Sequence, residues 1–163
     1  MNELWLDLRL LLLLAAANSA PIAAKHLFGA RWAAPLDGGL RFFDGRPVLG
    51  PSKTVRGLVA AVIVTALLAV LLGLPLAWGA LIGALSMAGD ALSSFTKRRL
   101  GIASSGRATG IDQIPEALLP LLAVQDAFAL PWLHVAAITL AFFLLEMPMA
   151  RLFFHFGLRD RPY

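Results

Sequence analysis

The 163-residue chain has no cysteine, and only 15% of its residues are charged. The absence of thiols excludes disulfides, a thiolate nucleophile and a cysteine-ligated zinc site. An average soluble domain has about a quarter of its residues charged. The shortage of charge, together with 59% hydrophobic residues and a mean hydropathy of +0.77, argues against a water-soluble globule. The sequence therefore predicts an all-α integral membrane protein.

Long apolar runs predict about five transmembrane helices. Between Gly57 and Phe95 the only charged residue is Asp90, and this run is longer than one span of about 20 residues. Gly73 and Pro75 lie in its middle and predict a turn between two spans. The expected spans are Leu10–Ala24 with Leu4–Leu8 before it, Leu58–Leu74, Leu76–Phe95, Ile114–Phe128, and Leu133–Leu145 extended to near Arg151. The fourth contains Pro115, Pro120, Gln125 and Asp126, so it either crosses as a short kinked helix or stays re-entrant.

The basic residues predict how these spans are oriented. Of the 14 Lys and Arg residues, 13 lie in Lys25–Arg56, Lys97–Arg107 and Arg151–Arg161, and none lies in the connections Gly73–Trp78 and Ala127–Trp132. By the positive-inside rule the three basic segments are cytoplasmic and the N-terminus is outside. The opening Met-Asn-Glu lacks the basic region of a signal peptide. We therefore expect a multi-pass plasma-membrane protein, one domain over residues 1–163, with a long cytoplasmic loop between the first two spans. The basic composition needs no nucleic-acid partner.

An acid inside an apolar span is costly and usually faces a polar interior, which makes Asp90 the first candidate for function. Ser94 and Lys97 follow at i+4 and i+7, so the three side chains share one helical face. This face leads to Arg98 and Arg99 at the cytoplasmic end. A carboxylate, a hydroxyl and a basic cluster at this position suit a metal and phosphates. The alternative is that Asp90 only pairs with a basic residue.

Asp112 follows the loop that leaves this helix and returns to the same membrane face. Locally it is a good N-cap for the next helix, because its side chain can accept a free backbone N–H. The topology also brings it near Asp90, so the two carboxylates could share one cation. Mg²⁺ prefers one or two carboxylates plus substrate phosphates. Asp90 and Asp112 are therefore the predicted metal ligands.

The segment Gly50–Gly57 lies directly before an apolar span. Its spacing does not match a nucleotide-binding P-loop, because two residues separate Gly50 from Lys53. Lys53 and Arg56 nevertheless supply positive charge, and Thr54 supplies a hydroxyl, beside a helix N-terminus that favours anions.

Other polar residues have weaker patterns. Asp37 and Asp44 lie in turn sequences, where they either solvate the loop or act at the site. Asn18 lies in the first span and either lines the site or bonds another helix. The three histidines have no metal-ligand spacing and no nearby acid pattern, so we expect interfacial or packing roles for them.

Gly89-Asp90, Ser94-x-x-Lys97-Arg98 and the later Asp112 resemble the signature of membrane CTP:lipid-phosphate cytidylyltransferases. A closer resemblance is to the CDP-archaeol synthase family. Its motifs here are Asn18 with Pro21, Pro35-x-Asp37, Asp44-Gly45, Gly50-x-x-Lys53-Thr54-x-Arg56-Gly57 and Gly110-x-Asp112-Gln113-x-Pro115. The longer acidic and glycine-rich ending of the phosphatidate-specific signature is missing after Arg99, which favours the archaeol-type branch.

The resemblance implies transfer of CMP from CTP to a membrane lipid phosphate of the 2,3-di-O-geranylgeranylglyceryl type, giving a CDP-lipid and pyrophosphate. The alternatives are a phosphatidate cytidylyltransferase acting on ester lipids and a non-enzymatic subunit of a multi-span transporter. A CDP-alcohol phosphotransferase does not fit, because Asp44-Gly45 is followed by Arg46-Pro47-Val48-Leu49 and not by its D-G-x-x-A-R pattern.

The implied roles follow the motifs residue by residue. Catalysis falls to Asp90, Lys97 and Asp112, with Mg²⁺ held by the two aspartates. Substrate binding falls to Lys53, Thr54, Arg56, Ser94 and Arg98. The expected partners are CTP, a membrane lipid phosphate and the bilayer, with a homodimer left open. The expected reaction is an in-line attack of the lipid phosphate on the CTP α-phosphate, on the cytoplasmic side.

Overall fold

The computed structural model describes residues 3–104, 106 and 108–157, and five helices account for most of them. They are α1 (Glu3–Phe28), α2 (Val55–Leu71), α3 (Leu76–Arg99), α4 (Gln113–Val124) and α5 (Trp132–His155). The described residues contain no β-strand, only two isolated bridges within the 29–54 connection. The all-helical prediction is confirmed. Arg107 and the basic tail beyond Gly157 lie outside the described residues.

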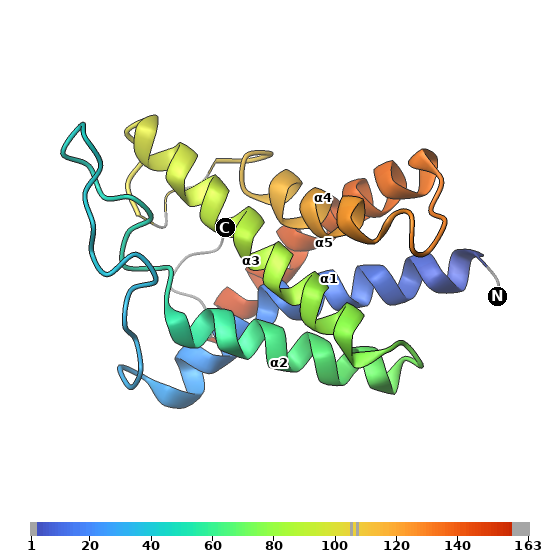
Figure 1. Ribbon diagram of the computed structural model, residues 1–163. Coiled ribbons are helices and arrows are strands. Elements are labelled where there is room, and N and C mark those ends of the chain that lie inside the picture. The colour runs from blue at the N-terminus through green and yellow to red at the C-terminus, as the bar shows by residue number, and fades with distance from the viewer. Residues whose placement is uncertain (1–2, 105, 107, 158–163) are drawn as a thin grey trace.

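The helices form a bundle whose two long connections lie at one end (Figure 1). The connections 29–54 and 100–112 are at this end, which we call the loop end. The N-terminus, the α2–α3 turn and the α4–α5 turn lie at the opposite end (Figure 1). The same division separates the basic connections from the uncharged ones in the sequence. The structure therefore gathers the basic loops at one end of the bundle.

The predicted turn between α2 and α3 is confirmed at residues 72–75. Gly73 has φ +74°, a left-handed conformation that glycine adopts without a steric penalty, and Pro75 precedes the first residue of α3. The two helices then pack closely through small residues. A Cβ atom added to Gly83 would lie 3.0 Å from the carbonyl oxygen of Ala61 on α2. Such contact without intervening side chains is typical of helix pairs in membranes.

Three helices, α1, α3 and α5, are long and apolar enough to cross a membrane, whereas α2 and α4 are shorter. The 12 residues of α4 rise only about 18 Å at 1.5 Å per residue. This helix starts beside the middle of α3, where a Cβ on Gly89 would collide with the backbone of Pro115. The 100–112 connection runs back along α3 to reach that point (Figure 1). The fourth predicted span thus corresponds to a short helix, α4, which follows a connection that already reaches the middle of α3.

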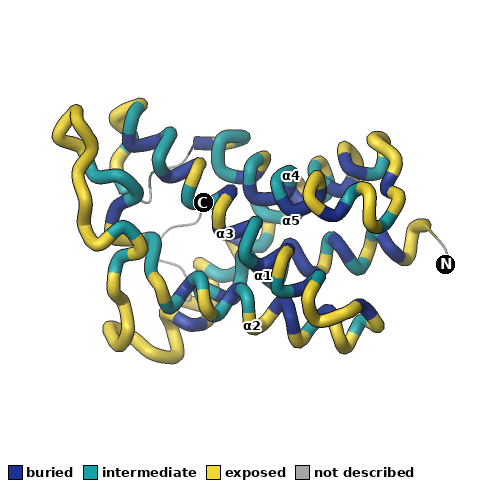
Figure 2. The backbone as a smooth tube through the Cα atoms, viewed as in Figure 1, coloured by how far each residue is buried: buried dark blue, intermediate teal, exposed yellow. Residues whose placement is uncertain are grey.

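The apolar core lies in the half of the bundle away from the loops. It includes Leu10 and Leu13 of α1, Leu121 of α4 and Val135 of α5, all nearly or fully buried. Figure 2 shows exposed residues along the outer faces of the helices, and many of these residues are apolar. On α2 the exposed residues include Val59, Ile63 and Leu67. Apolar surface of this extent suits contact with lipid hydrocarbon and not with water.

Candidate active site

A cavity of about 760 Å³ lies at the loop end of the bundle, and all five helices contribute apolar, polar and charged residues to its lining. All eight predicted site residues line it: Lys53, Thr54, Arg56, Asp90, Ser94, Lys97, Arg98 and Asp112. Asn18 of α1 lines it as well. Segments far apart in the sequence therefore converge on one space, and the cavity is the candidate active site.

Asp90 projects from α3 into this cavity and pairs with Lys53, which comes from the connection just before α2. The Lys53 ammonium lies 2.5 Å from both carboxylate oxygens of Asp90, and each side chain is 21% exposed. Burial acts to lower the pKa of Lys53, but the negative charges of Asp90 and Glu116 outweigh it and raise that pKa above its ordinary value. Lys53 therefore carries its positive charge throughout the physiological pH range.

Glu116 is a residue of the cavity that the sequence analysis did not single out. It lies in the first turn of α4 and is only 4% exposed, and its carboxyl group contacts that of Asp90. Gly89 makes this contact possible, because a Cβ there would lie 2.7 Å from the backbone nitrogen of Glu116. Glu146 of α5 also lines the cavity and was also missed. The signal for both was the one used for Asp90, an acid within an apolar segment.

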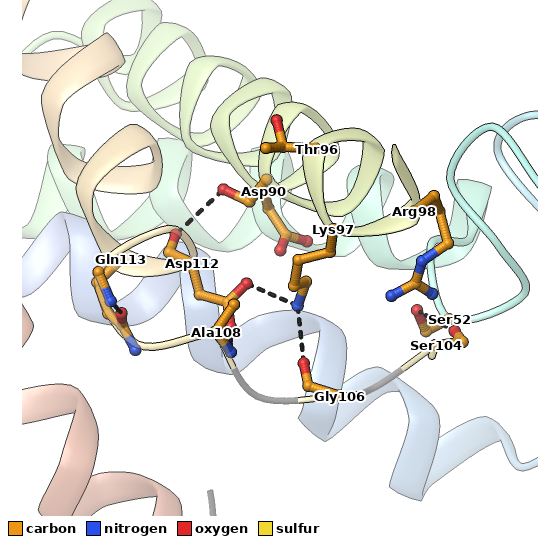
Figure 3. A network of polar contacts seen from close by, with 12 residues as sticks. Ser52, Asp90, Thr96, Lys97, Arg98, Ser104, Gly106, Ala108, Asp112 and Gln113 are labelled. Carbon is orange, nitrogen blue, oxygen red and sulfur yellow. Dashed lines mark hydrogen bonds and ion pairs between the residues drawn. The ribbon is translucent and has the colours of Figure 1, made fainter. Parts of the chain in front are cut away.

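Asp112 pairs with Lys97 in the same cavity (Figure 3). The Lys97 ammonium lies 2.6 Å from one oxygen of Asp112 and donates to the Gly106 carbonyl at 3.1 Å. The other oxygen of Asp112 accepts the backbone N–H of Ala108 at 3.2 Å. Asp112 occupies the N-cap position of α4 but makes no capping bond there. The expected capping role is wrong, because the carboxylate turns toward the preceding loop and Lys97.

The two serines after Asp90 have different environments. Ser94 is buried and lines the cavity, as its place on the Asp90 face predicts. Ser93 instead donates to the Gly89 carbonyl at 2.9 Å and the Asp112 carbonyl at 3.3 Å. Ser93 thus ties α3 to the segment that leads into α4, whereas Ser94 faces the cavity.

Three further predicted binding residues already make contacts within the protein. Thr54 caps α2 by accepting the Gly57 N–H at 3.2 Å. Arg56 donates through one nitrogen, Nη1, to the Gly29 and Arg31 carbonyls, each at 2.7 Å. Arg98 donates to the Ala103 carbonyl at 2.7 Å. All three also face the cavity, so they shape its wall as well as its charge.

The 29–54 connection is held in place by its own acids and by the end of α3. Asp37 accepts backbone N–H groups from Gly39, Leu49 and Gly50 at 2.8–3.2 Å. Burial acts to raise the pKa of Asp37, but these hydrogen bonds outweigh it and hold that pKa below its ordinary value. Asp37 is therefore a structural residue of the loop that carries Lys53.

The second acid of this connection pairs with α3. Asp44 lies 2.5 Å from the Arg99 guanidinium, and Arg46 donates to the carbonyl oxygens of Arg98 and Arg99 at 3.2 and 2.7 Å. The carbonyl groups at a helix C-terminus have no partners within the helix, so Arg46 satisfies part of this need. These contacts fix the loop over the cavity.

The surroundings of His134 differ from what the sequence predicts, because two acidic side chains lie near its ring. Its Nδ1 lies 2.7 Å from a carboxylate oxygen of Asp7, and its Nε2 lies 3.6 Å from Glu3. These acids belong to α1, far away in sequence, so no local pattern could reveal the pairing. The His134–Asp7 pair lies at the opposite end of the bundle from the cavity.

The possible metal-ligand atoms of the cavity would fill only part of the coordination shell of a hard cation. Among residues 3–104, 106 and 108–157, no group of three acidic or histidine side chains converges to form a complete metal site. Asp90 and Glu116 do converge, and the Oε2 atom of Glu116 is buried without a hydrogen-bond partner among the described atoms. Mg²⁺ commonly takes one or two carboxylates and completes its shell with water and phosphate oxygens. The carboxylates of the cavity could therefore supply part of the coordination shell of this ion, and substrate phosphates and water would have to complete it.

Comparison with known proteins gives the chain a family context. A family model described as CarS-like, CDP-archaeol synthase, matches residues 3–78 and 69–163. The chain is 38% identical over 118 residues to a CDP-archaeol synthase of Hyperthermus butylicus, a match that covers 69% of this chain and 67% of the relative. It is 33% identical over 150 residues to a CDP-archaeol synthase of Thermococcus gammatolerans, covering 82% and 78% of the two chains.

A solved structure shows a similar fold. It is described as an intramembrane enzyme for archaeal membrane lipid biosynthesis, and it superposes with a TM-score of 0.69 at 30% sequence identity. The superposition covers 84% of this chain and 90% of that one. The likeness therefore extends over most of the helical bundle.

Proposed function

This chain belongs to the CDP-archaeol synthase family, and from that membership we propose that it transfers CMP from CTP to the phosphate of an archaeol-type membrane lipid. A lipid phosphate oxygen attacks the α-phosphorus of CTP. A new P–O bond forms there while the bond between the α-phosphorus and its bridging oxygen to the β-phosphate breaks. The products are a CDP-lipid and pyrophosphate, so the reaction needs no oxidant and no nucleophilic side chain of the protein.

The observation that carries the proposal is the pair of lysine–aspartate contacts in one cavity surrounded by apolar helices. Two anionic substrates must approach each other, and the leaving group is also anionic. Preorganised positive groups that face the developing charge are the main source of catalysis in such reactions. Lys53 and Lys97 supply these charges, and the pocket that holds them is built by the family's own motifs.

We assign the roles as follows. Lys53, Lys97 and Arg98 bind phosphate oxygens, and Ser94 donates a hydrogen bond. Thr54 and Arg56 hold the start of α2 and the end of α1, which positions Lys53. Mg²⁺, when bound, would neutralise phosphate charge, and the side chains that fit it are Asp90 and Asp112, with Glu116 beside Asp90. The lysine pairs also fix the two carboxylates before substrate arrives.

The proposed membrane arrangement has five crossings within one catalytic domain. α1, α2, α3 and α5 would each cross as one helix, and the fourth crossing along the chain would combine the last part of the 100–112 connection with the short α4. Irregular backbone at membrane depth is tolerated where it lines a polar cavity, and this segment does so through Gly106 and Asp112. The loop end then faces the cytoplasm, where CTP is available.

The test is a transfer assay with purified protein in detergent, with radiolabelled CTP and a panel of ether-linked and ester-linked lipid phosphates. We expect CDP-lipid and pyrophosphate in equal amounts, with CTP and dCTP preferred over ATP and GTP and with ether-linked substrate preferred. Equal use of all four ribonucleotides would contradict the proposal. Preference for the ester-linked phosphate would identify a phosphatidate cytidylyltransferase instead.

A further inference from the structure

The Lys53 ammonium occupies a position that suits a metal ion. It contacts both oxygens of Asp90, which is how a carboxylate chelates a cation. The Glu116 carboxyl group lies against the same aspartate. Two carboxyl groups in contact repel each other unless a proton or a positive charge lies near them. The lysine therefore supplies the charge that a bound cation would supply.

Glu116 has an unused ligand atom at this position. The residue is 96% buried, lines the cavity, and leaves its Oε2 without a hydrogen-bond partner among the described atoms. A buried polar atom without a partner is costly to the folded protein, so such an atom is usually retained for a purpose. A cation between Asp90 and Glu116 would satisfy it.

The two lysines of the cavity differ in what holds them. Lys97 bridges a carboxylate and the Gly106 carbonyl. Among the residues that the structure describes, the Lys53 ammonium donates hydrogen bonds to the two carboxylate oxygens of Asp90 and to no other group. The backbone of Lys53 is fixed separately, since its carbonyl accepts the Leu36 N–H at 2.7 Å. Its flexible side chain can therefore leave Asp90 without any change in the loop.

We propose that Asp90 and Glu116 form a cation-binding pair that the Lys53 side chain occupies in the free enzyme, and that arrival of the metal and nucleotide moves this ammonium from the carboxylates to the phosphates. Lys53 is thus an exchangeable internal cation. The two substrates become coupled, because the phosphates offer the lysine a new partner at the moment the metal takes its former one. The nucleotide half of the exchange rests on the proposed function.

The exchange predicts opposite effects of one substitution on two ligands. In the nucleotide-free protein, Lys53→Met should tighten Mn²⁺ binding by at least about tenfold, because the competing charge is gone. In the metal-free protein, the same substitution should weaken CTP binding by about tenfold, because a phosphate contact is lost. A residue with only a structural role would weaken both. Mn²⁺ binding is measured by electron paramagnetic resonance and CTP binding by calorimetry, on the full-length protein in detergent.

Matched variants identify the groups involved. Lys53→Arg keeps the charge and should bind Mn²⁺ as weakly as the native protein. Adding Glu116→Gln to Lys53→Met should remove the gain in Mn²⁺ affinity. Lys97→Met alone should bind Mn²⁺ no more tightly than the native protein does. Unchanged or weaker Mn²⁺ binding in well-folded Lys53→Met protein would overturn the exchange, as would a gain that survives Glu116→Gln. If the native protein binds no CTP, the proposed function fails while the Mn²⁺ arm still tests the carboxylate pair.

Discussion

Asp90 and Asp112 are 22 positions apart, yet each meets a lysine in the same cavity. A carboxylate that leaves water needs a compensating charge, and removing one partner of such a pair is costly. Each aspartate is therefore positioned before any ligand binds. Its charge is also balanced, which permits an acid within an apolar helix.

We predict that Asp90→Asn and Asp112→Asn each lower the rate of CDP-lipid formation by about 10²–10³-fold. The amide keeps the size of the side chain but loses the charge that binds the cation and orients the lysine, and each 1.36 kcal/mol of lost transition-state stabilisation is tenfold in rate. The double variant should be little slower than either single one, because residues acting as a unit are not additive. The transfer assay at saturating Mg²⁺ measures these rates.

Asp126→Asn is the control, since Asp126 lies within the connection between α4 and α5, does not line the cavity and should be dispensable for activity. Melting temperatures of all variants show whether the fold survives. Near-native turnover in well-folded Asp90→Asn and Asp112→Asn proteins would show that the two acids do not form the catalytic site.

The lowered pKa of Asp37 predicts how the stability of the protein depends on pH. Because folding lowers the pKa of Asp37, its stabilising effect is present above the pKa of the unfolded chain, about 3.9, and is lost as the pH falls through the lower folded value. We expect Asp37→Asn to reduce the melting temperature by about 2–4 °C at pH 7, for a loss of about 1 kcal/mol. The difference should shrink below about pH 4. Thermal melts from pH 3 to 7 measure it, and a constant difference would contradict it.

The sequence was informative about the site where the relevant residues share one helix. Asp90, Ser94 and Lys97 follow the period of α3, so their common face could be predicted from spacing alone. Glu116 could not be matched with Asp90 in this way, because their contact depends on how closely α4 approaches α3. The His134–Asp7 pair was missed for the same reason, since its members lie on α5 and α1.

Gly89 sets the distance between α3 and α4 at the level of the site. A Cβ there would collide with the Pro115 carbonyl and lie 2.7 Å from the Glu116 nitrogen. Both contacts are with backbone, which cannot rotate away as a side chain can. The position of Glu116 relative to Asp90 therefore depends on the absence of a side chain at residue 89.

We predict that Gly89→Ala lowers the melting temperature by about 6–12 °C, because overpacking costs about 1–3 kcal/mol and backbone contacts place this case at the upper end. Turnover should fall further than stability explains, since α4 carries Glu116. Ala88→Val is the matched control, because the neighbouring Ala88 is exposed on the same turn of α3. A stable, active Gly89→Ala protein would mean that the α3–α4 contact is looser than described.

Helix positions were predicted better than helix ends. The turn at Gly73 and Pro75 was visible because glycine and proline interrupt an apolar run. The start of α4 was predicted to within one residue, with Asp112 at the N-cap position and Ile114 as the first residue of the span. The predicted fourth span began at Ile114, one residue after α4 begins, but extended beyond Val124, where α4 ends. The two prolines had already marked that span as weak.

The arrangement of the whole bundle can be tested with the cysteine-free chain. The hydroxyl oxygens of Ser52 and Ser104 lie 3.2 Å apart although they belong to different connections (Figure 3). Cysteines placed at both positions should form a disulfide under mild oxidation, because the side-chain ends are already in contact. Each single cysteine should react with a membrane-impermeant thiol reagent only from the cytoplasmic side. Labelling of the two positions from opposite sides would overturn the proposed topology.

The position of Asp90 along α3 has a consequence for the bilayer itself. Asp90 lies nine residues before Arg99, the last residue of α3, which corresponds to about 14 Å along the helix axis. The phosphate of a resting lipid lies at the headgroup level, so the proposed topology requires the substrate to sink below its neighbours or the membrane to thin above the site. Both adjustments cost free energy that grows with hydrophobic mismatch. The turnover rate should therefore depend on membrane thickness, and turnover in nanodiscs should decrease as the lipid chains are lengthened.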